Sequence, residues 1–277
     1  MTGRSVSYSQ DRQKIRKKGM SFIELPSHRL HYRIDGGVGP WLIFCNSLGT
    51  DHTMWDQQVA GLAHQFRILR YDQRGHGASG TPPGPYTIGE LGADVLALLD
   101  ALHIEKAHFC GLSIGGLTGQ WLAINAAHRF NHMALCATAA HIGSAPGWAK
   151  RSDDVQAGGL LSIASATQDR WFTPEYVRSA AEVVGRTIDS FVSTSVEGYI
   201  GCCSALASAD FSSHLPKITN AVLAIAGGDD SVCPPVQLAE IAHNVQHGEL
   251  CILPGRHMVN MESATELNLS LSRFFAS

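Results

Sequence analysis

One serine in the sequence has the neighbours expected of a nucleophile on a sharp turn. Ser113 lies at the centre of Gly111-Leu112-Ser113-Ile114-Gly115, which has the pattern G-x-S-x-G. The apolar run KAHFC precedes this motif, and a segment with helical spacing of apolar residues follows it. A strand-to-helix turn with small flanking residues exposes a serine oxygen for attack on a carbonyl. The pattern therefore predicts nucleophilic catalysis, with a tightly packed structural turn as the alternative.

A serine hydroxyl is a weak nucleophile near neutral pH and needs a base. The chain has fourteen histidines, and His257 is the one in a loop after the last predicted strand, within ILPGRHMVNMES. His243 lies within a predicted helix and His247 precedes a predicted strand, so both are expected away from the serine. We predict His257 as the base, with an exposed loop histidine as the alternative.

An acid should orient the imidazole and stabilise its positive charge. The segment AIAGGDDSVCPP supplies Asp229 and Asp230 directly after a predicted strand. Both side chains cannot point into one site, and the motif leaves the choice open. The chain order of serine, acid and histidine is that of α/β-hydrolases, and it differs from the orders of the chymotrypsin and subtilisin proteases.

Two backbone N–H groups are predicted to stabilise the oxyanion of the tetrahedral intermediate. The first belongs to Ile114, which follows the nucleophile at the start of a helix. The second should come from the loop after the third predicted strand, and in NSLGT we assign it to Leu48.

The glycine-rich loop YDQRGHGAS lacks the pattern of a phosphate-binding loop. Its Arg74 is expected to brace the loop near the oxyanion segment rather than to contact substrate. The sequence contains no HExxH motif and no evident grouping of two histidines with a carboxylate, so no metal and no cofactor are predicted.

Alternating apolar and amphipathic segments must position these groups. Strands are predicted at residues 22–25, 30–34, 41–46, 67–71, 106–110, 132–138, 221–226 and 249–253. Helices are predicted at residues 87–102, 114–127, 236–244 and from 263 onward, the first with a capping box of Thr87 and Glu90. Strand and helix alternate, which predicts an α/β fold with a largely parallel sheet between two layers of helices.

The alternation of strands and helices stops in the middle of the chain. Residues 141–215 have helical patterns without a buried strand, which predicts a helical cap inserted between core segments 21–140 and 216–277. Residues 1–20 are basic and lack an apolar segment. We interpret them as a disordered extension, with Met20 as an alternative start and a nucleic-acid arm as the less favoured hypothesis.

The composition is that of a soluble globular protein. Of the 277 residues, 44% are hydrophobic and 16% are charged, with a net charge of −3. No apolar run approaches the roughly 20 residues that span a bilayer, and no secretory signal is evident. The seven cysteines form no disulfide or zinc pattern. We therefore expect a cytoplasmic protein that binds neither nucleic acid nor membrane; its oligomeric state stays open.

Longer stretches of the chain resemble the 3-oxoadipate enol-lactonase family of α/β-hydrolases. The resemblance includes NSLGTDHTMWDQQVAGLAHQFRILRYDQRGHGASG, PPGPYTI and AHFCGLSIGGLTGQWLA, and also RWFTP and EGYIGCCSAL within the predicted cap. It implies an eight-stranded, mostly parallel sheet. In the family the acid precedes a short step ending in Thr-Pro, and this alignment selects Asp230 over Asp229. The chain departs from the family at Cys233, where threonine is common, and GRHMVNMESA is a looser match around the histidine. Many α/β-hydrolases have His-Gly where this chain has Asn46-Ser47.

The resemblance also implies a substrate, a small lactone with a free carboxylate, which is hydrolysed through an acyl-enzyme. A cation or N–H donor should then lie on the cap side, and Lys150, Arg151 and Arg170 are candidates among which the sequence does not choose. For each of them a solvated surface charge is the favoured alternative. Trp148 and Trp171 are predicted to form the apolar wall of the substrate site, with the core of the cap as an equal alternative for each. An esterase or lactonase of other specificity is the main alternative, and a non-catalytic ligand receptor is a weaker one.

Overall fold

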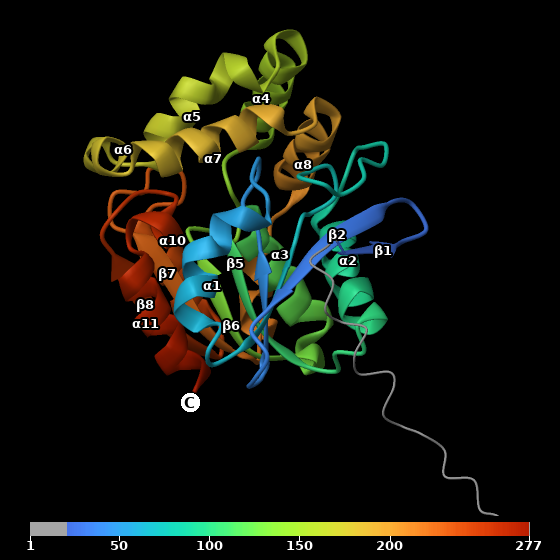
Figure 1. The fold of residues 1–277 in the computed structure, drawn as a ribbon, viewed down its shortest axis with the longest axis vertical. Coiled ribbons are helices and arrows are strands. Elements are labelled where there is room, and N and C mark those ends of the chain that lie inside the picture. Colours follow the sequence, from blue (N-terminus) through green and yellow to red (C-terminus); the bar gives the residue numbers. More distant parts are fainter. Residues whose placement is uncertain (1–20, 277) are drawn as a thin grey trace, which may run out of the picture.

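The computed structural model describes residues 21–276, which contain one eight-stranded sheet (Figure 1). The strands are β1 (Ser21–Glu24), β2 (Arg29–Asp35), β3 (Trp41–Cys45), β4 (Arg67–Tyr71), β5 (Ala107–Leu112), β6 (Phe130–Cys136), β7 (Ala221–Gly227) and β8 (His247–Leu253). Their order across the sheet is β1-β2-β4-β3-β5-β6-β7-β8. The pairs β1–β2 and β2–β4 are antiparallel, and all other pairs are parallel. The predicted fold class is confirmed.

The central strands are apolar because both faces of the sheet are covered by helices. All six residues of β5 are buried, as are four of the five in β3. Helices α1 (Asp56–Leu62) and α11 (Ala264–Phe275) pack together on one face, and α2 (Ile88–Ala101) and α3 (Ile114–Asn125) pack together on the other (Figure 1). Continuous apolar runs are typical of parallel strands buried in this way.

Local signals set several helix boundaries. Thr87 caps α2 through the predicted capping box, in which its side chain accepts the Glu90 N–H and Glu90 accepts the Thr87 N–H. Helix α9 (Pro235–Asn244) begins with proline at its first position, where the missing N–H costs no hydrogen bond. The short α10 (Val259–Glu262) follows β8 and precedes α11.

The segment between β6 and β7 contains helices and no strand. It comprises α4 (Ala145–Gly158), η4 (Leu160–Ile163), α5 (Ala164–Trp171), α6 (Pro174–Ser179), α7 (Ala181–Ser193), α8 (Val196–Ser208) and η5 (Ser212–Lys217). Helices α4 to α8 form a layer above the carboxyl ends of the parallel strands (Figure 1). Their description as a separate cap domain stays a prediction.

Two parts of the sequence-based assignment differ from the structure. The turn η2 (His52–Trp55) and α1 were not predicted, although Asp51 caps η2 by accepting the Thr53 N–H at 2.8 Å. Strand β8 begins at His247 and not after it, because the strand pairs with β7 from its first residue. This outer strand is largely exposed and so lacks the apolar run that marks a buried strand.

Two further expectations concern the first twenty residues and whether any segment could cross a membrane. The predicted basic extension, residues 1–20, lies outside the described residues. Within residues 21–276, no helix combines the length and the apolar composition that crossing a membrane requires.

Candidate active site

The backbone around Ser113 has the geometry of a strained strand-to-helix turn. Ser113 joins β5 to α3 with φ 60° and ψ −118°, a conformation that non-glycine residues rarely adopt. A Cβ on Gly111 would lie 2.3 Å from the Gly115 carbonyl oxygen, and one on Gly115 would lie 2.4 Å from the Cys45 carbonyl oxygen. Both glycines are therefore required by close backbone contacts, which hold the serine at the tip of the turn.

His257 and Asp230 meet although 27 residues separate them in the chain. His257 Nδ1 lies 2.8 Å from Asp230 Oδ2, and both residues are buried. Asp230 Oδ1 accepts the backbone N–H groups of Val232 at 2.7 Å and Cys233 at 3.1 Å. These bonds fix the carboxylate and leave one oxygen for the imidazole. Asp229 is exposed to solvent, so it is Asp230 that contacts the histidine.

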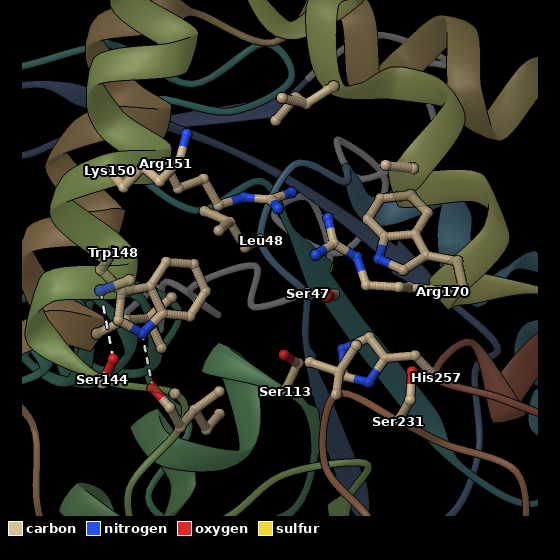
Figure 2. A pocket seen from close by; sticks show the side chains of 18 of the residues that line it. Ser47, Leu48, Ser113, Ser144, Trp148, Lys150, Arg151, Arg170, Ser231 and His257 are labelled. Atoms are coloured by element: carbon tan, nitrogen blue, oxygen red, sulfur yellow. Dashed lines mark hydrogen bonds between the residues drawn. The ribbon is translucent and has the colours of Figure 1, made fainter.

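Ser113 and His257 line the same cavity and lie beside one another at its base (Figure 2). Among the described residues, the Ser113 hydroxyl forms no hydrogen bond with the imidazole. Such bonds are often long in enzymes without substrate and tighten in the complex. The arrangement supplies a nucleophile, a base and an acid at one end of the sheet.

The two predicted oxyanion donors are available for a ligand. Within residues 21–276, neither the Leu48 N–H nor the Ile114 N–H donates a hydrogen bond to the protein, although both residues are buried. Ile114 is the first residue of α3, where the N–H has no partner inside the helix. Leu48 lines the cavity beside Ser113. Unpaired buried donors next to a nucleophile suit a developing negative charge.

The cavity between the core and the helices above it has a volume of about 580 Å³. Trp148 and Trp171 both line it, as predicted for the apolar wall. Trp148 Nε1 donates to the Ile142 carbonyl at 2.6 Å, which fixes the indole against the wall. The Trp171 carbonyl accepts the Met258 N–H at 3.0 Å, next to His257. Trp171 is buried and packs edge-on against Phe172 and Phe191, so contact of either indole with substrate stays a prediction.

The three candidate cations all line the cavity but differ in their partners. Lys150 is exposed and forms an ion pair with Asp154 at 2.8 Å. Arg151 donates through Nε to the Tyr199 hydroxyl at 2.6 Å. Arg170 is half-buried and has no hydrogen bond or ion pair with any described residue. Figure 2 shows its guanidinium facing that of Arg151 above Ser113 and His257.

Within residues 21–276, no carboxylate or hydrogen-bond acceptor compensates the charge at Arg170. Burial lowers the pKa of Arg170, and the neighbouring charge of Arg151 lowers it further. A guanidinium nevertheless stays protonated in proteins. Two guanidinium groups that face one another on one side of a cavity, one of them without a partner among the described residues, form a site suited to an anion.

Known proteins with similar sequences and structures show the family of the chain. The family described as alpha/beta hydrolase fold matches residues 40–264. The chain is 45% identical to 3-oxoadipate enol-lactonase 2 of Acinetobacter baylyi, over 83% of this chain and 86% of that protein. It is 40% identical to 3-oxoadipate enol-lactonase 1 of the same organism, over 86% and 89% of the two chains. The chain belongs to the 3-oxoadipate enol-lactonase family of α/β-hydrolases. The crystal structure of the enol-lactonase from Burkholderia xenovorans superimposes with a TM-score of 0.91 at 42% identity, covering 93% of this chain and all of that one.

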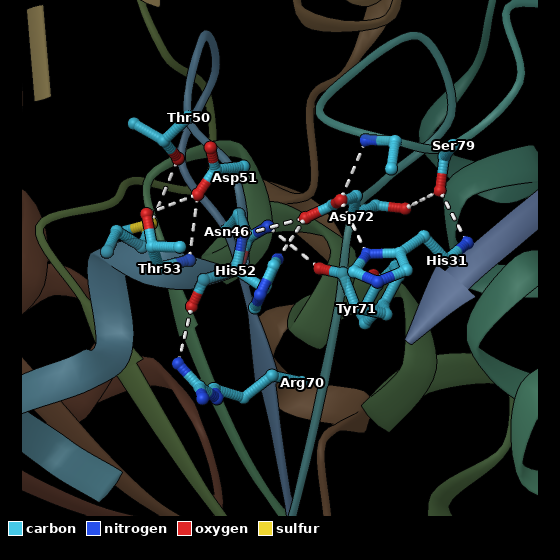
Figure 3. Close-up of polar contacts among 12 residues, drawn as sticks. His31, Asn46, Thr50, Asp51, His52, Thr53, Arg70, Tyr71, Asp72 and Ser79 are labelled. Atoms are coloured by element: carbon cyan, nitrogen blue, oxygen red, sulfur yellow. Dashed lines mark hydrogen bonds and ion pairs between the residues drawn. The ribbon is translucent and has the colours of Figure 1, made fainter. Parts of the chain in front are cut away.

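In this member of the enol-lactonase family, a buried network that the sequence did not reveal supports the site (Figure 3). Asp72 Oδ2 lies 2.8 Å from His31 Nδ1 and accepts the Ala78 N–H at 2.9 Å. Asp72 Oδ1 lies 2.9 Å from His52 Nδ1 and accepts the His52 N–H at 2.8 Å. Burial alone would raise the pKa of Asp72, but the bonds from His31 and His52 outweigh it and hold that pKa well below its ordinary value.

This network brings together two histidines and a carboxylate, a grouping the sequence analysis had not found. Forty-one residues separate His31 from Asp72, so no local spacing could signal it. Four N–H donors occupy the two oxygens of Asp72, which leaves it few lone pairs for a cation. The grouping is therefore a structural junction between β2, η2 and the loop after β4.

Two other residues of the enol-lactonase core also have structural roles. Asn46 donates to the Tyr71 carbonyl at 2.8 Å and accepts the Trp55 Nε1–H at 3.0 Å. Arg74 donates to Asp94 at 2.7 Å and to Glu90 at 3.0 Å on α2. The prediction that Arg74 braces its loop is confirmed.

Proposed function

We propose that the protein hydrolyses 3-oxoadipate enol-lactone to 3-oxoadipate, with Ser113 as nucleophile, His257 as base and Asp230 as the acid that orients it. One observation carries the choice of substrate. The buried pair of His257 and Asp230 lies beside Ser113 at the base of a cavity, and Arg170, which has no partner within residues 21–276, lies above them (Figure 2). A lactone with a free carboxylate fits both ends of such a cavity. The identity of 45% to an enol-lactonase of Acinetobacter baylyi supports the same substrate.

The first half of the reaction forms an acyl-enzyme. Ser113 Oγ attacks the lactone carbonyl while His257 Nε2 takes its proton, and Asp230 stabilises the imidazolium through Nδ1. The negative charge that develops on the carbonyl oxygen is bound by the N–H groups of Leu48 and Ile114. Collapse of the intermediate breaks the ring C–O bond. The leaving group is an enolate, which is less basic than an ordinary alkoxide and depends less on protonation by His257.

The second half of the reaction releases the product. The enolate released on ring opening takes the proton held at His257 Nε2, which restores the neutral imidazole, and the resulting enol tautomerises to the ketone. A water molecule gives a proton to His257 Nε2 and attacks the ester carbonyl of the acyl-enzyme. Ser113 Oγ leaves and recovers its proton from His257, and 3-oxoadipate is formed.

Side chains of the helical segment above the sheet orient the substrate in this proposal. Arg170 binds the free carboxylate of the lactone, and Arg151, held by Tyr199, adds positive charge to the same side of the cavity. Trp148 and Trp171 contact the apolar faces of the ring. In this proposal residues 141–215 act as a cap domain that sets specificity, while residues 21–140 and 216–276 supply the chemistry.

A cytoplasmic location accords with the state of the cysteines. All seven lie in the described residues, and none is in a disulfide. Thiols of this kind are typical of a reducing compartment.

The decisive test is a steady-state assay on the enol-lactone, generated in situ from its precursor, next to a panel of p-nitrophenyl esters. Wild type should turn over the enol-lactone with a larger kcat/KM than any ester, and Ser113→Ala should show no turnover. Preference for simple esters would instead support a general carboxylesterase. Equal inactivity of wild type and Ser113→Ala would support a ligand receptor.

A further inference from the structure

The peptide group that carries the Leu48 N–H is held by the protein from its other side. The Ser47 carbonyl oxygen, which belongs to the same peptide, accepts the Thr50 hydroxyl at 2.8 Å and the Thr50 N–H at 3.3 Å. Gln73 Nε2 approaches the same oxygen at 3.4 Å. A trans peptide is planar, with its N–H and C=O pointing in opposite directions. These bonds therefore direct the Leu48 N–H away from Thr50 and leave it free for the cavity.

The next peptide is held by a histidine from the glycine-rich loop. His76 Nε2 accepts the Gly49 N–H at 2.9 Å, while its Nδ1 lies 3.1 Å from the Arg74 carbonyl oxygen. Nδ1 therefore carries the proton and donates it to Arg74, and Nε2 is the acceptor. With the peptides on both sides of Leu48 fixed, its φ and ψ have little freedom.

Aromatic side chains close the opposite side of Gly49. This residue has φ +78°, and a Cβ there would lie 2.5 Å from Phe191 and 3.3 Å from Tyr199. Both rings come from the helical segment above the sheet and are fully or almost fully buried. Gly49 is thus in contact both with the imidazole of His76 and with these two rings.

We propose that His76 and Thr50 are positioning residues that hold the Leu48 N–H in the direction required to bind the oxyanion. Neither side chain lines the catalytic cavity within the described residues, so each acts through the backbone of residues 47–49. The inference rests on the proposed site at Ser113, but it applies to any ester attacked there. Donors fixed in advance stabilise a transition state without reorganisation.

The protonation state of His76 suits this role. Burial lowers its pKa to about 4, although the Arg74 carbonyl and the charges of Asp72 and Asp51 act in the opposite direction. Nε2 is consequently unprotonated throughout the neutral range and remains an acceptor for Gly49.

The test compares His76→Leu, which removes the acceptor, with His76→Gln, whose amide oxygen can replace Nε2. Thr50→Val independently removes the hydroxyl that donates to the Ser47 carbonyl at 2.8 Å and leaves the longer bonds from the Thr50 N–H and Gln73 in place. The matched control is His108→Leu, because His108 is also buried and has a pKa lowered to about 4, yet lies at the other end of β5 from Ser113. Each folded variant is assayed for kcat and KM on an ester that wild type hydrolyses. Binding of a trifluoromethyl ketone, whose adduct with Ser113 carries an oxyanion, is measured in parallel.

We expect His76→Leu and Thr50→Val to lower kcat by about 10- to 100-fold and to weaken ketone binding by a similar factor, with KM changed by less than about threefold. His76→Gln should recover most of both losses, and His108→Leu should match wild type. The proposal is overturned if kcat of His76→Leu and Thr50→Val equals that of the control, or if kcat falls while ketone affinity does not. Failure of the proposed substrate would appear differently, as wild type that hydrolyses esters but not the enol-lactone.

Discussion

Two carboxylates in the core and one arginine in the helical segment above it differ in whether they have hydrogen-bond partners. In the core, Asp230 is held by two backbone N–H groups and Asp72 by four N–H donors, so each carboxylate has a fixed direction. In the helical segment, Arg170 faces the cavity without a partner among the described residues. Under the proposed mechanism, the difference teaches that the carboxylates of the core are oriented before substrate arrives, whereas Arg170, the proposed contact to the substrate carboxylate, gains its partner from the substrate.

The largest effect on activity is expected from substitution of Asp230, the proposed acid of the core. Asp230→Asn should lower kcat by about 10⁴-fold, because an amide cannot hold the imidazole in the required tautomer or stabilise its charge. The neighbouring Asp229→Asn is the matched control, since Asp229 is exposed, and its kcat should stay within about twofold of wild type. Steady-state kinetics on the enol-lactone measures both. A damaging Asp229→Asn beside a mild Asp230→Asn would show that the acid has been misassigned.

A smaller and different effect is expected from the helical segment. Arg170→Gln should raise KM for the enol-lactone by about 10- to 100-fold with little change in kcat, because it removes a charged contact to a non-reacting carboxylate. KM for a neutral ester should hardly change. Lys150→Gln is the control, because Lys150 already pairs with Asp154. An equal loss on charged and neutral substrates would mean that Arg170 is structural.

The junction between the two regions provides a test of stability. A Cβ on Gly198 of α8 would lie 2.4 Å from the Gly75 Cα, so Gly198→Ala should lower the free energy of unfolding by about 1–3 kcal/mol. Gly185→Ala on the exposed side of α7 meets no atom within 4 Å and should be neutral or stabilising by up to about 1 kcal/mol. Chemical denaturation of both variants measures the difference. Equal free energies of unfolding for the two variants would show that the backbones at Gly75 and Gly198 can move apart without loss of stability.

The smallest expected effect is on the pH dependence of stability, and it arises from His108, which lies in the core far from the site. Burial lowers the pKa of His108 to about 4, with the charges of His132 and Lys106 acting in the same direction. Between pH 6.5 and 4 the unfolded chain binds a proton that folded His108 does not, so stability falls as the pH falls. His108→Phe should reduce the slope of the free energy of unfolding against pH by at most about 1.4 kcal/mol per pH unit. Unfolding free energies measured from pH 4 to 7 test it, and an unchanged slope would exclude this histidine.

The sequence predicted those features that depend on local pattern. Continuous apolar runs located the buried strands, and the glycines around Ser113 predicted the turn that the structure contains. Capping at Thr87 was equally visible, because both of its partners lie within one helical turn. Strand β8 began earlier than predicted, because an exposed edge strand carries no continuous apolar run.

Features that depend on long-range contacts could not be predicted in this way. The junction at Asp72 joins residues up to 41 positions apart, and nothing in the spacing of His31 and His52 indicates it. The choice among the three cap cations likewise depends on which of them has a partner, and that is a property of packing. Only the family resemblance favoured Asp230 over Asp229, and the contact with His257 now gives a physical reason for it.

The close approach of Gly75 and Gly198 has a consequence for exchange of segments between relatives. The first residue lies in the loop after β4 and the second in α8, yet neither position has room for a side chain. Substitution at one position during evolution is therefore limited by the residue at the other, even though the two segments have different roles. A chimaera that takes its helical segment from another hydrolase would need glycine at position 198, or a compensating retreat of the loop, to seat that segment on this core.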